Sequence, residues 1–307
     1  MSDSRRGIVY GIAAYVLWGL FPLYLPLLRP SGSVEILAQR MVWSLATVLV
    51  ILVVRRNWRW VRALVDSPRR MLLVVIAALL ITANWGTFIF AVNTGHTVDA
   101  SLGYFISPLV NVAFAVLVFR ERLRPAQWAA VGLGTAAVLV LTVDYGSLPW
   151  IGLILAAVFG TYALMKKLIK LDGPEALSAE TVALFLPALG VLIAMQAMGT
   201  GTFGHISGVH SLLMVGVGIL TALPLLFFGA CAIRVRMTTL AMLQYIAPIM
   251  QFLVGWLVFG EHMSTGRWIG FVIVWVALVV LSADLLRHAH RGRALRAEAA
   301  ALDPAAG

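Results

Sequence analysis

The sequence predicts an all-α integral membrane protein with ten transmembrane helices, arranged as two inverted five-helix repeats. Three observations lead to this fold class: the composition, the apolar segments with basic residues between them, and a duplication 140 residues apart. Of the 307 residues, 61% are apolar and only 12% are charged. Soluble domains are nearer half apolar and a quarter charged, so lipid is the simpler solvent for this chain.

Ten apolar segments are each long enough, at roughly 20 residues, to cross a hydrocarbon core of about 30 Å. We expect them at residues 7–28, 34–54, 71–92, 100–119, 126–143, 149–165, 180–199, 210–232, 238–259 and 267–286. The breaks around 93–99 and 233–238 are the weakest, so eight or nine helices is an alternative count. The first segment is too long for a signal-peptide core and lacks a small-x-small cleavage site, which predicts an uncleaved helix.

Basic residues predict the orientation. If the N-terminus is cytoplasmic, twenty Lys and Arg residues lie on the cytoplasmic side and two, Arg29 and Arg267, on the other. Cytoplasmic loops of membrane proteins carry this excess of positive charge. We therefore expect an inner-membrane protein with both termini cytoplasmic and a basic, disordered tail at 287–307. The net charge of +10 is explained by this topology, so no nucleic-acid partner is expected.

The duplication divides the chain into two halves. Residues 105–123 and 245–263 align without a gap and share six identical positions, including Pro108 with Pro248 and Glu121 with Glu261. An offset of 140 or 141 residues persists on both sides, which predicts repeats at 5–145 and 146–286. Because five helices is an odd number, the second repeat enters the membrane upside down, as in many secondary transporters.

The order and wording of several segments resemble one family. The segments are WGLFPLY, EILAQRMVWS, NWGTFIFAVNTGHTVDASLGYFISPLVNV, FRERL, LTALPLLFFGACAI and LQYIAPIMQFLVGWLVFGE. Together they resemble the RarD-type branch of the EamA-like transporters, in the drug/metabolite transporter superfamily, over about residues 5–286. This resemblance implies ten helices in two inverted EamA repeats and an inner-membrane permease; the branch carries the label "chloramphenicol-sensitive protein". Gln39 departs from the histidine that is usual there, so no histidine-based proton role is expected at that position.

Arg40 needs a reason to be inside the membrane. It lies about six residues into the second segment, roughly 9 Å from its outer end at 1.5 Å per residue. A charge at such a depth is costly and is commonly functional. It could hold a substrate anion, or it could pair with Glu35 or extend toward the outer interface. Its equivalent in the second repeat is Glu180, of opposite charge.

Other polar and aromatic residues at mid-depth predict a central solute cavity. Amide side chains there can bind a polar solute, although they more commonly join helices. The expected cavity residues are Trp18, Arg40, Asn84, Trp85, Tyr104, Asn111, Gln244, Tyr245 and Gln251. Pro108 and Pro248 each remove a helical hydrogen bond and would act as hinges, or as static bends. The patterns GIVYG (7–11) and GRWIG (266–270) predict close helix packing.

The leading functional hypothesis is a permease that moves a small organic metabolite or drug-like solute, outward, by alternating access. No nucleotide-binding, metalloprotease, hydrolase or redox motif is found, so we expect no enzyme activity, metal or cofactor. The alternatives are a membrane scaffold or sensor without transport, and an intramembrane enzyme acting on a lipid-linked substrate. Substrate identity, coupling ion and oligomeric state are not predicted.

Overall fold

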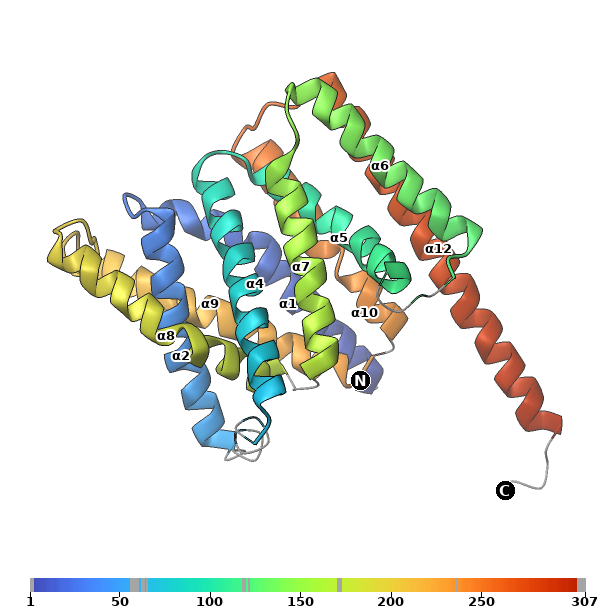
Figure 1. The fold of residues 1–307 in the computed structure, drawn as a ribbon, viewed down its shortest axis with the longest axis horizontal. Coiled ribbons are helices and arrows are strands. Elements are labelled where there is room, and N and C mark those ends of the chain that lie inside the picture. Colours follow the sequence, from blue (N-terminus) through green and yellow to red (C-terminus); the bar gives the residue numbers. More distant parts are fainter. Residues whose placement is uncertain are drawn as a thin grey trace.

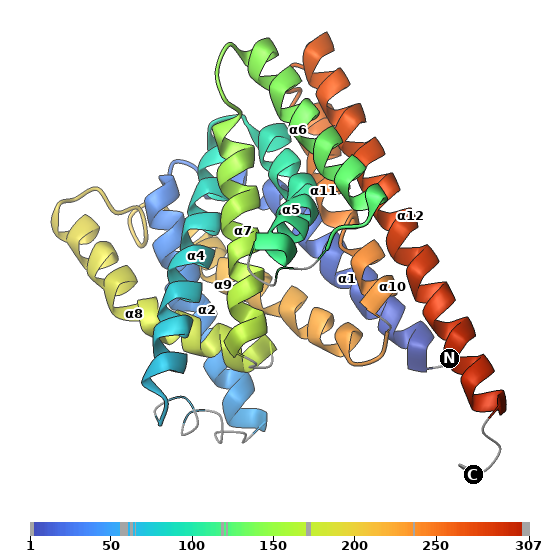
Figure 2. The ribbon, with the colours of Figure 1, turned by 45° about the vertical axis from the view of Figure 1, so that its right-hand side comes forward.

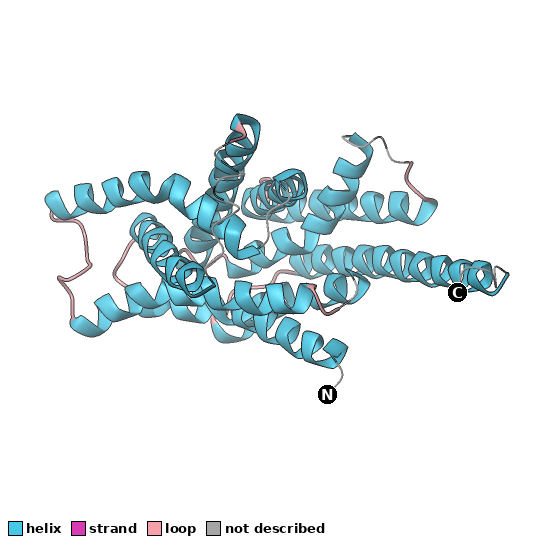
Figure 3. Cartoon of the chain, turned by 90° about the horizontal axis from the view of Figure 1, so that it is seen from below, coloured by secondary structure: helices cyan, strands magenta, loops and turns pink. Residues whose placement is uncertain are grey.

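The structure is a computed structural model, and it describes residues 3–55, 61, 64, 66–117, 120, 122–169, 173–235 and 237–302. Within this part of the chain, all regular structure is helical (Figures 1 and 3). The elements are α1 (Asp3–Tyr24), η1 (Leu25–Leu28), α2 (Ser33–Arg55), α4 (Pro68–Asn93), α5 (Thr97–Leu117), α6 (Pro125–Tyr145), α7 (Trp150–Ile169), α8 (Gly173–Ala197), α9 (Gly208–Ala232), α10 (Met237–Leu243), α11 (Ile246–Leu253), η2 (Val254–Val258) and α12 (Thr265–Leu302).

The predicted all-α membrane class is confirmed. Each of the ten predicted segments coincides with helical structure. Among the described residues, seven helices are long and apolar enough to cross a membrane, while Trp150–Lys166 and Ile246–Val258 are shorter apolar helices. The count of ten membrane crossings therefore stays a prediction.

One predicted helix is interrupted. Residues 238–259 were expected to form a single span, but the chain forms α10, a turn at Gln244 and Tyr245, α11, and the π-helical turn η2. Pro248 explains the position of the break, because it has no N–H to give to the carbonyl of Gln244, and its ring clashes with that carbonyl. The expectation of one continuous helix is wrong here.

The C-terminal end also differs from expectation. A disordered tail was predicted from residue 287, whereas α12 continues as a helix to Leu302. Side chains beyond His288 lie outside the description, as does the duplicated residue Glu121.

The helices alternate in direction between two ends of the bundle. One end carries the N-terminus and the connections at 56–67, 120–124 and 233–236; we call it the N-terminal face. The other carries the connections at 29–32, 94–96, 146–149, 198–207 and 259–264; we call it the Glu face, after Glu35 and Glu261. Both chain termini lie toward the same end, as an even number of crossings requires (Figures 1 and 2).

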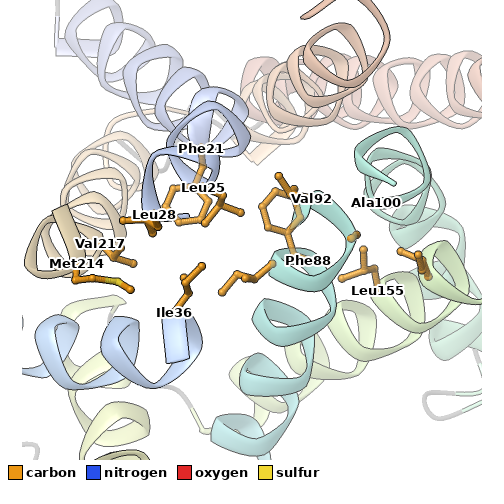
Figure 4. Close-up of a cluster of buried hydrophobic side chains, with 13 residues drawn as sticks. Phe21, Leu25, Leu28, Ile36, Phe88, Val92, Ala100, Leu155, Met214 and Val217 are labelled. Carbon is orange, nitrogen blue, oxygen red and sulfur yellow. The ribbon is translucent and has the colours of Figure 1, made fainter. Parts of the chain in front are cut away.

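A large apolar cluster fills the bundle near the Glu face (Figure 4). It is built where α1, η1, α2, α4, α5, α7 and α9 converge, and its centre includes Leu25, Leu28, Ile36 and Met214, all with no exposed surface. Because these helices come from both predicted halves, the cluster joins the halves at this end of the molecule.

Glycines allow two helix pairs to approach closely, as the two small-residue patterns predicted. A methyl group on Gly11 of α1 would lie 2.6 Å from Leu243 Cδ1 and 2.7 Å from Cys231 Sγ. One on Gly270 of α12 would lie 2.5 Å from Leu141 Cγ of α6. Figures 1 and 2 both show α6 and α12 lying side by side at one edge of the bundle.

Candidate solute site

Arg40 is a buried cation with aromatic neighbours. It lies on α2, is 5% exposed, and its guanidinium carbon lies 4.7 Å from the ring centre of Phe21 on α1 and 4.1 Å from that of Trp85 on α4. Its Nε has no hydrogen-bond partner in the described part of the chain. The aromatic faces attract the positive charge but offer no acceptor for its N–H groups.

The pair between Arg40 and Glu35 does not form. Glu35 is 1% exposed and its carboxylate accepts hydrogen bonds from the backbone N–H groups of Thr202 (2.8 Å) and Phe203 (3.1 Å). It also accepts one from the Thr202 hydroxyl, at 2.9 Å. Glu35 therefore fastens the α8–α9 connection to α2 at the Glu face and leaves Arg40 without this anion.

Asn84 and Tyr104 lie close to Arg40 and bond each other. The Tyr104 hydroxyl donates to Asn84 Oδ1 at 3.0 Å, and it is near enough to Arg40 to interact electrostatically. Asn84 Nδ2 and the hydroxyl of Ser44, one helical turn from Arg40, are buried without partners in the described residues. Buried polar groups are nearly always paired, so this concentration of unpaired groups calls for an explanation.

Glu180 lies on α8, close to the same tryptophan. It is 2% exposed and accepts hydrogen bonds from Lys166 Nζ at 2.8 Å and the Tyr162 hydroxyl at 3.0 Å. Glu180 and Trp85 both line a cavity of about 10 Å³, together with Met41, Ile81, Thr82, Thr181 and Leu184. This volume holds roughly one water molecule. Trp85 thus lies between two buried charges of opposite sign, one unpaired and one paired.

A chain of aromatic rings also connects these two charges. Ring centres are 6.2 Å apart for Phe21 and Phe88, 6.0 Å for Phe88 and Tyr104, 5.6 Å for Tyr104 and Phe159, and 6.3 Å for Phe159 and Tyr162. Arg40 contacts the first ring of the chain and Glu180 bonds the last. The rings come from α1, α4, α5 and α7, so four helices contribute apolar walls around the charges.

The other predicted cavity residues fall in separate places. Gln251 Nε2 donates to the Trp18 carbonyl at 3.2 Å, joining α11 to α1, and Gln251 Oε1 is buried without a partner in the described residues. Asn111 is exposed on α5, beside Gly160 of α7. Gln244 and Tyr245 form the turn between α10 and α11, and the Tyr245 hydroxyl bonds Ser282 of α12.

The two prolines differ in their surroundings. Pro108 lies within the continuous helix α5, whereas Pro248 lies in α11, three residues beyond the α10–α11 turn. Their role as hinges stays a prediction.

Two further links close the Glu face. Glu261 accepts hydrogen bonds from the N–H groups of Thr97 (2.5 Å) and Val98 (2.8 Å), in the first turn of α5. A carboxylate is favourable there because helix N-termini carry unpaired donors and a positive dipole end. Arg267 lies 3.8 Å from Asp99, to which the Tyr145 hydroxyl donates at 2.5 Å.

The same helix contacts occur twice, at the offsets of the sequence duplication. A methyl group on Gly19 of α1 would lie 2.6 Å from Met250 of α11, and one on Gly160 of α7 would lie 2.8 Å from Val110 of α5. Gly160 follows Gly19 by 141 residues, and Met250 follows Val110 by 140. The charged residues repeat likewise: Arg40 contacts Phe21, while Glu180 bonds the residue 141 positions after Phe21.

Sequence reasoning did not identify Phe21, Ser44, Tyr162 or Lys166 as parts of this region. A signal existed for Tyr162, because the alignment that matches WGLF with FGTY places it opposite Phe21. Lys166 was counted only as a cytoplasmic charge. Among the described residues, no group of three His, Cys, Asp or Glu side chains could hold a metal ion.

Comparisons with known proteins define the class. Residues 5–143 match the EamA-like transporter family. The chain is 54% identical over 300 residues to Protein RarD of Streptomyces exfoliatus, covering 98% of this chain and 95% of that protein. It is 39% identical to an uncharacterized transporter of Vibrio cholerae serotype O1, covering 96% and 97% of the two chains. One solved crystal structure, at 18% identity, shares the fold with a TM-score of 0.57 over 91% of this chain and 96% of the other.

The chain is therefore a multi-pass membrane transporter of the EamA-like family. Within that family it belongs to the RarD-type branch, and its substrate is a small molecule.

Proposed function

We propose that this protein is an inner-membrane permease that moves a small organic metabolite or drug-like solute outward by alternating access. The solute would bind around Arg40, Trp85 and Tyr104, between two inverted repeats at 5–145 and 146–286. The observation that carries the proposal is the repeated contact: Gly19 with Met250, and Gly160 with Val110. Helices at equivalent sequence positions make equivalent contacts, as two inverted copies of one unit would do.

The closed Glu face supports a gated path. Glu35, Glu261 and the apolar cluster of Figure 4 join elements of both halves at that end. If the N-terminal face is cytoplasmic, as the basic residues predict, the periplasmic side is shut in this state. Opening must then break the Glu35 and Glu261 bonds, and closing the other end must accompany it, because an alternating carrier never opens both ends together.

Reconstitution tests transport. Purified protein in liposomes should show saturable uptake and counterflow for some members of a broad metabolite and drug panel. Metabolite profiles of cells and medium, with the gene deleted or overexpressed, would supply candidates for the panel and show the direction. Fluxes equal to those of protein-free vesicles throughout the panel would contradict the proposal.

A reversible cross-link tests the gating. Ser31 Oγ and Thr202 Oγ1 lie 2.6 Å apart at the Glu face, so cysteines at both positions should be close enough to bridge. In a Cys231→Ser background, oxidising Ser31→Cys/Thr202→Cys should stop transport and reduction should restore it. The single-cysteine proteins are the controls, and unchanged flux through the cross-linked protein would exclude opening at this face.

Reporter tags test the proposed topology. A tag after Val143 and a tag after Leu285 should report opposite compartments, the second of them cytoplasmic. Both tags in one compartment would rule out the inverted arrangement and with it the proposed mechanism.

A further inference from the structure

We propose that Arg40 binds the carboxylate of an organic acid, and that the transported solute is a monoanion with an apolar body. This inference deepens the proposed function and rests on it for the transport step, although binding can be tested separately. It assigns a chemical class of ligand to the region between Phe21, Trp85 and Tyr104.

The first support is an uncompensated charge. Removing a cation from water is costly unless an anion or several acceptors replace the lost solvation. The two buried carboxylates that Arg40 could have used are both engaged, Glu35 by Thr202 and Phe203, and Glu180 by Lys166 and Tyr162. In the described part of the chain, Arg40 Nε finds no acceptor.

The second support is the kind of group left unpaired nearby. Ser44 Oγ and Asn84 Nδ2 are buried without partners among the described residues, and both can donate a hydrogen bond. The Tyr104 hydroxyl bonds Asn84 Oδ1, so the amide presents its nitrogen to the surroundings. A positive charge accompanied by unpaired donors fits a ligand that brings negative charge and acceptor oxygens.

Charge balance and shape select a carboxylate. The neighbouring cation, Lys166, is neutralised by Glu180, so Arg40 contributes one uncompensated positive charge. A carboxylate matches this with one negative charge, and its two oxygens fit the parallel N–H groups of a guanidinium. Phe21, Trp85, Phe88, Tyr104 and Phe159 provide apolar walls, which would contact the rest of the solute.

The test measures binding to the purified full chain in nanodiscs. The probes are three acids, benzoate, 3-phenylpropanoate and hexanoate, each compared with its neutral amide, and phenyl phosphate as a dianion. Binding is read as a ligand-dependent rise in the thermal unfolding midpoint, which follows mass action. At least one acid should bind saturably and at least about tenfold more tightly than its amide, as expected for a charge-assisted hydrogen bond, and phenyl phosphate should bind more weakly.

Variants locate the site. Arg40→Gln should weaken acid binding at least about tenfold and leave amide binding within about twofold, whereas Arg40→Lys should retain part of the preference for the acid. Arg29→Gln, which removes an exposed charge at the Glu face, is the matched control and should bind as the wild type does. If Arg40→Gln does not fold, Asn84→Asp supplies the second test, because an isosteric carboxylate near Arg40 should raise the unfolding midpoint and abolish acid binding.

Three results would overturn the inference: no acid binding better than its amide, tighter binding of phenyl phosphate, or acid binding unchanged in both Arg40→Gln and Asn84→Asp. Counterflow of the same acids in liposomes separates this inference from the proposed function. Acid binding without any flux would support the site and contradict the permease, while flux of neutral solutes without acid binding would do the opposite.

Discussion

The duplicated helix has two different conformations in the two halves of the molecule. In the first half α5 (Thr97–Leu117) is continuous through Pro108, and in the second half the chain breaks into α10 and α11 just before Pro248. Both copies contact a glycine of the opposite half in the same way, at Gly19 and at Gly160. The contact is repeated although the backbone is not.

The difference shows that proline alone does not decide where a helix breaks. Each proline deprives the carbonyl four residues earlier of its partner, at Tyr104 and at Gln244. In α5 the N-terminus is held by Glu261 and Tyr104 is bonded to Asn84. The side chain of Gln244 has no hydrogen bond in the described residues that would hold it likewise, and the turn forms there. Two inverted copies must differ in any one state of an alternating carrier, and this pair is where they differ most visibly.

The largest expected effect concerns the buried charges. Lys166→Met would leave Glu180 with the Tyr162 hydroxyl alone, and losing one partner of a buried pair should lower the free energy of unfolding by about 3 kcal/mol. Chemical unfolding in mixed micelles measures this. The control is Asp3→Asn, which breaks the exposed pair with Arg234 and should cost less than about 1 kcal/mol. Equal losses in the two variants would show that Glu180 does not need its cation.

The next effect concerns the anchoring of α5. Glu261→Ala removes the acceptor of two backbone N–H groups and should cost about 2 kcal/mol, because both donors lose a charged partner. Glu261→Gln keeps an acceptor without charge and should cost about half as much. Amide hydrogen exchange should show faster exchange in the first turn of α5, and unchanged protection there would contradict the anchoring role.

Glycine substitutions test whether the repeated contact is equally tight in both halves. Gly19→Ala and Gly160→Ala should each destabilise by roughly 1–2 kcal/mol, because the new methyl groups meet Met250 and Val110 at 2.6 and 2.8 Å. Gly132→Ala is the control, since nothing lies within 4 Å of its added methyl group, and helix propensity should make it slightly stabilising. A stabilising Gly160→Ala would mean that the contact is not duplicated energetically.

The smallest effect on stability, about 1 kcal/mol, is expected from replacing the prolines. Pro248→Ala restores an N–H that can reach the Gln244 carbonyl, so the α10–α11 turn should become helical and transport should slow. Pro108→Ala lies in a helix that is already continuous and should change transport less. Circular dichroism and liposome flux together check both results, and equal flux changes would remove the distinction between the two copies.

Several features followed from the sequence because they depend on local pattern. Apolar length predicted the helices, and the glycine patterns predicted the close approach of Gly11 and Gly270 to their neighbours. The duplication placed Arg40 and Glu180 at equivalent positions, but it could not show that Lys166 pairs with one and that the other is bare. Such pairing depends on how helices rotate against each other, which a single chain's periodicity does not specify. The turn at Gln244 was missed for the same reason, since Pro108 has the same local sequence signal.

The position of Cys231 offers a chemical clock for helix separation. Its sulfur has no exposed surface and lies where any side chain larger than hydrogen at Gly11 would collide with it. A maleimide can therefore reach this thiol only while α1 moves away from α9, and since the chain has a single cysteine, the alkylation rate of the unaltered protein reports that opening without an engineered label.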